Sequence, residues 1–228
     1  MDAIGNYVAR YARSREEELT LDEYLGECKR NPLAYATAAE RMLSAIGEPQ
    51  MVDTRNEPRL SRIFANKVIK IYPAFAEFYG MEEAIEQVVS YFRHAAQGLE
   101  ERKQILYLLG PVGGGKSSIA ERLKRLMEHV PFYAIKGSPV NETPLGLFDV
   151  QEDGPVLLEN YGIPKRYLQR ILSPWAVKRL EEFGGDIRQF KVVRRYPSVL
   201  KQIGVSKTEP GDENNQDISA LVGKVDIR

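Results

Sequence analysis

The sequence of 228 residues has little cysteine, little histidine and no excess of charge of either sign. Cys28 is the single cysteine, so no disulfide can form within the chain, and we expect a reducing, cytoplasmic location. One cysteine and two histidines, His94 and His129, are too few for a typical structural zinc site. Lys plus Arg and Asp plus Glu number 32 each, so the zero net charge gives no general reason to expect nucleic acid or an anionic membrane as a partner.

Long apolar runs and several catalytic motifs are missing as well. No apolar run approaches the length of a membrane span, and residues 1–15 lack the apolar segment of a signal peptide. The sequence contains neither the H-R-D and D-F-G motifs of the common protein-kinase fold nor the G-x-S-x-G turn of serine hydrolases. Apolar residues make up 43% and charged residues 28% of the chain, which is typical of a globular protein.

The clearest motif is GPVGGGKSS at residues 110–118, directly after the apolar run 105–109. It matches the phosphate-binding pattern G-x-x-x-x-G-K-[ST], placed between an expected strand and an expected helix. Glycines let backbone N–H groups wrap a triphosphate, and the following helix adds the positive end of its dipole. We expect Lys116 to act on the β- and γ-phosphates of ATP as the catalytic cation, and the Ser117 hydroxyl to ligate Mg²⁺. The expected nucleotide contacts are Gly110, Pro111, Val112, Gly113, Gly114, Gly115, Lys116, Ser117 and Ser118. The alternative is a glycine-rich turn that binds nothing.

Apolar periodicity predicts an α/β fold, a P-loop NTPase with a parallel sheet and flanking helices, preceded by an N-terminal helical segment. Before the loop we expect helices over 2–46 with a capping box at Thr20 and Glu23 and a break at Asn31-Pro32, a connecting loop at 48–58, a helix or strand over 63–72, a helix over 82–98 and a strand over 103–109. After the loop we expect a helix over 116–129, a strand over 132–135, irregular chain over 137–160, helices over 163–172 and 174–184, a strand over 190–196, a short helix over 198–203 and a strand over 205–208. We divide the chain into residues 1–58, the helical segment, and 59–228, the P-loop domain.

An acidic partner for Mg²⁺ is harder to find. Phosphoryl transfer on this fold needs an acid on a strand next to the loop. The nearest matches are residues 156–159, VLLE, and Val225-Asp226, and neither has paired acids. The acidic loop at 209–217 is a further candidate, although such loops are usually only solvated. The sequence therefore indicates nucleotide binding more clearly than catalysis.

Longer stretches resemble a known family. Residues 78–123, FYGMEEAIEQVVSYFRHAAQGLEERKQILYLLGPVGGGKSSIAERL, resemble the AAA+ ATPase module, which implies that Tyr79 and Gly80 line an adenine pocket. The runs RLSRIFANKVIKIYPAFAEFYGMEEAIEQ, YGIPKRYL, SPWAVKRL and KTEPGDENNQDISALVGKVDIR are similar to those of PrkA-type bacterial serine protein kinases, and the likeness covers nearly the whole chain. Members of that family are longer, so we expect the chain to end within an incomplete AAA+ domain, with Walker B acids and sensor residues beyond Arg228.

The resemblance implies ATP and Mg²⁺ as cofactors and transfer of the γ-phosphate to a serine of a protein substrate in stress or starvation signalling. It also allows a homo-oligomer in which arginines of neighbouring subunits complete the site. The alternative is an AAA+ ATPase or ATP-gated scaffold that passes the phosphate to water. A third reading is a truncated chain that binds nucleotide weakly and does no chemistry. The residues themselves do not favour the kinase over these alternatives.

Overall fold

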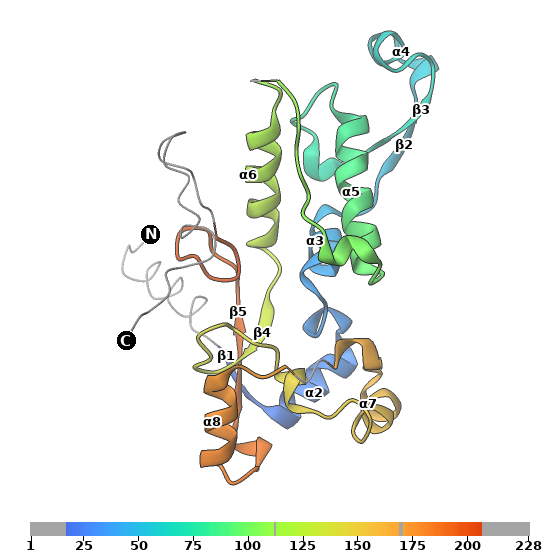
Figure 1. Ribbon diagram of the computed structural model, residues 1–228. Helices are drawn as coiled ribbons and strands as arrows, with labels where there is room; N and C mark the ends of the chain where they lie inside the picture. Colours follow the sequence, from blue (N-terminus) through green and yellow to red (C-terminus); the bar gives the residue numbers. More distant parts are fainter. Residues whose placement is uncertain (1–16, 112, 169–170, 207–228) are drawn as a thin grey trace, which may run out of the picture.

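The computed structural model describes residues 17–111, 113–168 and 171–206 (Figure 1). The strands are β1 (Glu17–Thr20), β2 (Gln50–Asp53), β3 (Val68–Ile71), β4 (Phe132–Ile135) and β5 (Lys191–Arg195). The α-helices are α2 (Leu21–Arg30), α3 (Ala38–Ile46), α4 (Pro58–Phe64), α5 (Glu82–Ala96), α6 (Lys116–Met127), α7 (Gly154–Tyr161) and α8 (Pro174–Glu182). Short 3₁₀ turns connect many of them.

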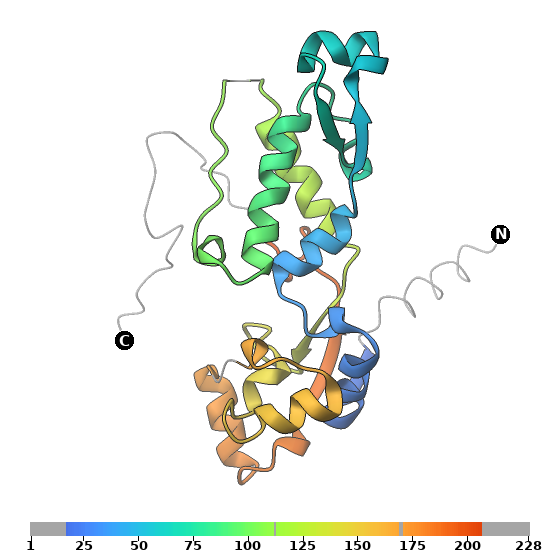
Figure 2. The same ribbon diagram turned by 90° about the vertical axis from the view of Figure 1, so that its right-hand side faces the viewer.

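The elements form two lobes, each around its own hydrophobic cluster, and Figure 2 shows one lobe above the other. The sheet lobe contains β1, β4, β5, α2, α7 and α8, and the helical lobe contains α3, α5 and α6 (Figure 1). Each cluster combines residues from before and after residue 58. Before it, α2 contributes to the cluster of the sheet lobe and α3 to the cluster of the helical lobe, and the other members of both clusters come mostly from after it. The division of the chain at that residue stays a prediction.

The sheet lobe is built on three strands in the order β1-β5-β4. Both pairs are antiparallel, with Leu19 opposite Val192 and Ala134 opposite Val193. The β-branched residues of the central strand favour an extended backbone, and Val192 and Val193 are both fully buried. The strands predicted at 132–135 and 190–196 are therefore confirmed, and the second runs from Lys191 to Arg195.

The helical lobe follows from the apolar periodicity of its helices. The buried faces of α5 and α6 consist of Ile85, Val88, Val89, Ile119, Leu123, Leu126 and Met127. These positions recur at helical spacing, so they lie on one side of each helix and pack together. Met42 and Ile46 of α3 complete the cluster. The helices expected over 82–98 and from Lys116 are confirmed.

Helix ends are also largely as the sequence predicts. Thr20 and Glu23 form the expected capping box at the start of α2. Thr37 and Glu40 form a second one at α3, which begins later than predicted because Pro32 first starts a 3₁₀ turn. Ser173 caps α8, with Pro174 at its start.

An arm formed by residues 50–71 projects from the helical lobe (Figures 1 and 2). Strands β2 and β3 pair antiparallel within it, with Val52 opposite Ile69, and α4 lies between them in sequence. The predicted connecting loop at 48–58 was therefore wrong over 50–53. Short strands of this kind have too few residues for an alternating pattern to be recognised.

The predicted parallel sheet is not present in the described part of the chain, where every strand pair is antiparallel. Residues 105–109 form no strand, and in Figure 2 they run along the edge of the helical lobe. Their side chains nevertheless alternate: Leu106 and Leu108 pack on the helical cluster, whereas Ile105, Tyr107 and Leu109 are 91%, 79% and 85% exposed. Alternation is the pattern of a strand, but a strand also needs a hydrogen-bonded neighbour.

Four further predictions differ from the structure. Within the irregular stretch 137–160, α7 forms because Gly154 and Pro155 occupy first-turn positions that tolerate proline. The helix expected over 163–172 is reduced to a 3₁₀ turn at Lys165–Tyr167. Residues 198–203 form a turn instead of a helix, closed by two backbone hydrogen bonds, from Ser198 N to Ile203 O and from Ile203 N to Ser198 O. Residues 205–206 of the strand predicted over 205–208 are not in a strand, and residues 207–208 lie outside the described residues. The acidic loop at 209–217 and Val225-Asp226 also lie outside the described residues.

Candidate functional site

The glycine-rich loop lies at the N-terminus of α6, as its sequence predicts. The first helical hydrogen bond of α6 runs from Ile119 N to Gly115 O at 2.9 Å, and no side chain caps the helix. The N–H groups of Lys116, Ser117 and Ser118 precede that bond, so they are the donors that a helix start offers to an anion. The loop and the helix dipole therefore favour negative charge at the same place.

Glycine is required at consecutive positions of the loop for separate physical reasons. Gly113 and Gly115 have φ angles of +79° and +74°, which side-chain-bearing residues rarely adopt. A Cβ atom on Gly114 would lie 3.0 Å from the carbonyl oxygen of Pro111. A Cβ on Gly115 would lie 2.8 Å from Sδ of Met81. The backbone thus forms a cradle that side chains would fill, as binding of a polyphosphate requires. Val112 lies outside the described residues.

Lys116 points back into the loop. Its Nζ donates hydrogen bonds to the carbonyl oxygens of Gly110 and Pro111, both at 2.6 Å. Charge-assisted hydrogen bonds of this length hold the ammonium group at the centre of the cradle. A phosphate that entered the loop would therefore meet a cation that is already in position.

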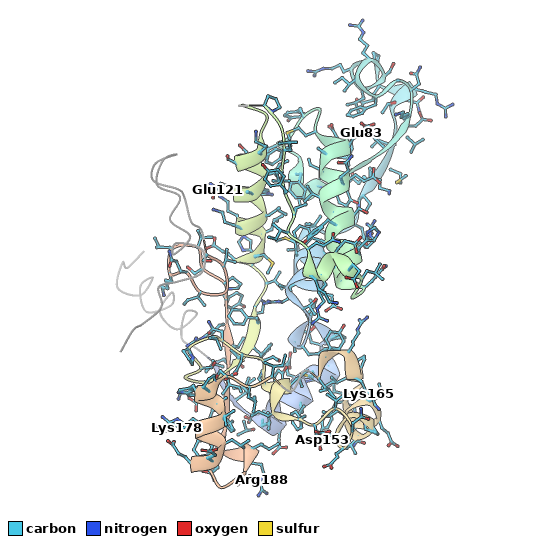
Figure 3. All side chains as sticks on the ribbon, in the orientation of Figure 1. Glu83, Glu121, Asp153, Lys165, Lys178 and Arg188 are labelled. Carbon is cyan, nitrogen blue, oxygen red and sulfur yellow. The ribbon has the colours of Figure 1, made fainter. Side chains whose placement is uncertain are left out.

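A hollow of about 570 Å³ adjoins the loop. It is lined by Glu77, Phe78, Gly115, Ser117, Ser118, Glu121, Arg122 and Arg125. Figure 3 labels Glu121, which projects from α6 on the side facing away from α5 in that view. Ser117 and Ser118 are exposed, so both hydroxyl groups are accessible to a ligand in the hollow. Arg122 Nε donates to the carbonyl oxygen of Ala74 at 2.6 Å, which ties α6 to the chain before Tyr79.

Tyr79 and Gly80 lie close to the loop in the chain's fold but line a different cavity. Met81, the next residue, contacts Gly115 through its sulfur atom, as the short Cβ distance there shows. Tyr79 is 87% exposed, and with Gly80 it borders an apolar cavity of about 540 Å³ between the arm and α5. No residue of 110–118 lines that cavity among the described ones. The adenine role of Tyr79 and Gly80 stays a prediction.

The oxygen-bearing side chains of the hollow beside the loop are Glu77, Ser117, Ser118 and Glu121, and the metal role of Ser117 stays a prediction. The described residues contain no group of three or more His, Cys, Asp or Glu side chains suited to a metal. The VLLE stretch at 156–159 lies in α7 of the sheet lobe, so it is helical and cannot be the acidic strand end. Mg²⁺ commonly keeps most of its ligands from water and substrate phosphates, so a serine hydroxyl fits such a site.

Two residues of the site were missed from the sequence. Met81 and Arg122 join the segment before α5 to the phosphate loop, the first by packing and the second by a hydrogen bond. Both residues lie in stretches with a helical pattern, and nothing in the neighbouring sequence indicates that either contacts a distant segment. Their partners are far away in sequence, and the hydrophobic cluster shared by α3, α5 and α6 brings them together.

Comparison with known proteins finds one matching family model and several curated relatives. The family model described as "PrkA AAA domain" matches residues 19–228. The chain is 65% identical over 232 residues to the serine/threonine kinase YeaG of Escherichia coli strain K12, which covers 100% of this chain and 36% of that protein. It is 35% identical over 229 residues to the ATP-dependent protease PrkA of Bacillus subtilis strain 168, covering 94% of this chain and 34% of that protein. The chain thus spans about a third of the length of these curated relatives. No solved structure matches.

Proposed function

Because the chain belongs to the PrkA AAA domain family, we propose that it binds ATP and Mg²⁺ at residues 110–118 as the nucleotide-binding part of a serine protein kinase. The observation that carries the proposal is the position of Lys116, whose ammonium group is held at 2.6 Å from two loop carbonyls at the start of α6. The resemblance to a relative named a serine/threonine kinase supports the reaction class.

In this proposal the loop's own groups bind and orient the nucleotide. Backbone N–H groups of 113–118 surround the phosphates, and Lys116 neutralises charge on the β- and γ-phosphates. Ser117 holds the metal ion, which when bound polarises the phosphate oxygens. Tyr79 and Gly80 form the adenine side, because Met81 fixes their segment against Gly115. A protein serine is the acceptor, and the reaction serves stress or starvation signalling in the cytoplasm.

The unbroken apolar run at 105–109 supports a place for this segment in a parallel nucleotide-binding sheet, because the strands of such sheets are buried on both faces. We also propose that copies of the protein assemble so that arginines of neighbouring subunits reach the phosphates. No helix in the described part of the chain is long and apolar enough to span a membrane.

The second candidate is an ATPase that transfers the phosphate to water. The Bacillus subtilis relative is named an ATP-dependent protease, and such a machine uses ATP without forming phosphoserine. The same loop chemistry serves both reactions, because Lys116 acts on the phosphates and not on the acceptor.

ATP binding and product analysis test these proposals. We expect Lys116→Ala to weaken ATP binding by about 10- to 100-fold, the equivalent of one or two charge-assisted hydrogen bonds. Lys103→Ala is the matched control, because Lys103 is exposed and makes only a 3.8 Å ion pair with Glu100. Equal ATP affinity in the Lys116→Ala protein and the wild type would overturn ATP binding at the loop.

Incubating the purified protein with γ-labelled ATP and candidate protein substrates separates the two reactions. Labelled phosphoserine that disappears in Lys116→Ala supports the kinase. Free phosphate without phosphoserine supports the ATPase and overturns the kinase. Equal protein labelling by wild type and Lys116→Ala would show that the label does not come from this site.

A further inference from the structure

The apolar cavity of about 540 Å³ between the arm and α5 has a carboxylate in its wall, that of Glu82. Glu82 is the first residue of α5 and is only 9% exposed. Its Oε2 atom is buried and has no hydrogen-bond partner in the described part of the chain. Oε1 likewise has no partner there but keeps accessible surface, so it is the oxygen that a ligand can reach. Because the two oxygens share one negative charge, a cation at Oε1 would compensate the whole group.

Glu82 is one of three acids in the first two turns of α5, and the other two have partners. Glu83 Oε1 lies 3.7 Å from Lys67 Nζ, and Glu86 forms an ion pair with Lys70, so both lysines of the arm pair with α5 (Figure 3 labels Glu83). Glu82, the most buried of the three, has no ion pair among the described residues. The positive end of the helix dipole offsets only part of the cost of burying its charge. The arrangement therefore has a place for a third cation, which no described residue fills.

Aromatic side chains form another part of the cavity wall. Phe78 is half-buried, and its ring packs edge-on against Phe75 with the ring centres 5.9 Å apart, which fixes its orientation. Tyr79 is 87% exposed, so it lies at the rim of the cavity. The faces of such rings attract cations, most strongly where water is excluded. A carboxylate beside aromatic rings suits an ammonium or a guanidinium group.

The other charged side chains of the lining do not alter this preference. They are Glu57, Arg59 and Lys70, and Lys70 is already compensated by Glu86. Glu57 and Arg59 are exposed, carry one charge of each sign and form no ion pair in the described part of the chain. Among the described lining residues, the charge that is both buried and uncompensated is therefore negative, which favours a cation over an anion.

The cavity is also next to the proposed site of chemistry. Phe78 lines it and also lines the hollow of about 570 Å³ beside the phosphate loop, so the two spaces share one side chain as a wall. An extended polypeptide advances about 3.3 Å per residue, so a segment of a few residues can pass one side chain. A residue bound in the cavity therefore brings its neighbours in the chain to the hollow beside the loop.

We propose that this cavity binds a lysine or arginine side chain of the protein substrate, with the cationic group on Glu82 Oε1 and the apolar stem along Phe78 and Tyr79. That the polypeptide is a substrate rests on the proposed kinase function, whereas the cation site does not. The volume lies in the range of about 300–1,000 Å³ for ligand pockets, which leaves room for peptide backbone beside the side chain. The site then selects serines that have a basic residue a few positions away.

Binding is measured first without ATP, so that the result does not depend on phosphoryl transfer. The probes are capped five-residue alanine peptides whose central residue is lysine, arginine or norleucine, titrated by ligand-detected NMR at equal ionic strength. Norleucine keeps the apolar stem of lysine and lacks its charge. We expect the lysine and arginine peptides to bind about 10-fold or more tightly than the norleucine peptide.

Glu82→Gln keeps the shape of the side chain and removes its charge. It should weaken binding of the lysine peptide by about 10-fold and leave the norleucine peptide unchanged. Glu83→Gln is the matched control, because Glu83 is the next residue, is exposed and lies outside the cavity lining. It should change neither affinity.

Thermal unfolding separates a binding role of Glu82 from a structural one. Both glutamine variants lose the interaction with the helix dipole, but only Glu82→Gln removes a buried charge that has no partner. Without peptide, Glu82→Gln should therefore melt no lower than Glu83→Gln. A lower melting temperature would show that Glu82 already has a stabilising partner in the protein, and it would overturn the site.

The binding data can also overturn the site directly. Equal affinity for the lysine and norleucine peptides, or equal affinity of the two glutamine variants for the lysine peptide, would do so. Tyr79 and Gly80, proposed for adenine, also border this cavity. Displacement of the lysine peptide by adenosine would show that the cavity takes the base, and it would overturn the proposal as well.

A kinase assay tests the assignment to the substrate. With γ-labelled ATP and peptides that place lysine within four residues of a serine, Glu82→Gln should raise KM more than it lowers kcat, because Glu82 touches no reacting atom. Lysine-dependent binding without any phosphoserine would overturn the substrate assignment and leave the cation site in place, so failure of the proposed function is distinguishable.

Discussion

Substituting Gly115 by alanine tests the contact that joins the phosphate loop to the segment of Tyr79 and Gly80. Two effects add at this position. The φ angle of +74° is unfavourable for alanine by about 1–2 kcal/mol. The new Cβ would also lie 2.8 Å from Met81 Sδ, and because this atom is at the far end of a flexible side chain that can shift, the overlap costs about 1 kcal/mol.

Gly98→Ala is the matched control. Gly98 has a φ angle of +81°, and a Cβ atom added there would meet nothing within 4 Å, so this variant has the backbone strain without the overlap. The loss of backbone freedom in the unfolded chain is the same for both substitutions and cancels in the comparison. Gly115→Ala should therefore lower the free energy of unfolding by about 1 kcal/mol more than Gly98→Ala, or about 2–4 °C in melting temperature for a chain of this size.

Thermal and urea unfolding measure the difference, and a double-mutant cycle with Met81→Ala assigns it. Met81→Ala alone loses packing on the helical cluster, but combined with Gly115→Ala it also removes the overlap, so the two changes should be less than additive. ATP binding should fall in Gly115→Ala and stay unchanged in Gly98→Ala. If the two glycine variants unfold at the same temperature, the contact between Met81 and the loop is refuted.

Two further predictions concern stability and reactivity. Glu40→Ala should lower the free energy of unfolding, measured in urea, by about 1–3 kcal/mol, and by more than Glu23→Ala. Both glutamates complete a capping box, but only Glu40 also bonds Tyr167 and Arg166 of the other lobe. Equal losses in the two variants would contradict a stabilising contact between the lobes. Burial raises the pKa of the Cys28 thiol to about 12, so native protein at pH 8 should resist alkylation that urea-unfolded protein undergoes readily. Since the unfolded thiol ionises first, this contribution to stability is complete below about pH 8.5 and declines as the pH rises toward 12, a decline that Cys28→Ala should remove in alkaline unfolding curves. Rapid native labelling would contradict it.

The parts of the fold that the sequence predicts correctly are those decided by neighbours in the chain. The capping box of Thr20 and Glu23 needs only residues three apart, and the phosphate loop needs only nine consecutive residues. The positive φ angles of Gly113 and Gly115 follow from the same short stretch. Local chemistry therefore predicts the glycine-rich loop at the start of α6 without the rest of the fold, and phosphate binding there stays a prediction.

The parts that failed depend on pairing between distant residues. Strand β1 pairs with β5, which lies more than 170 residues later in the chain, with Glu17 opposite Arg194. The residues around β1 do not indicate which strand it pairs with. The expected order of strands came from the strand–loop–helix–strand pattern around 105–135, which fits a parallel sheet equally well. The contacts of Met81 and Arg122 were missed for the same reason.

The described residues contain neither a strand partner for residues 105–109 nor an acidic cluster for Mg²⁺ near Ser117, and the two absences are related. Residues 105–109 alternate like a strand but have no strand pairing there, and Ile105, Tyr107 and Leu109 are left exposed. Near Ser117 there is also no acidic cluster for Mg²⁺ among the described side chains. On this class of fold the metal-holding acid stands at the end of a strand beside the strand that leads into the loop. A single strand placed along 105–109 would cover the exposed apolar residues, complete the backbone pairing and carry an acid to Ser117, so the structural and the catalytic requirements have one common solution.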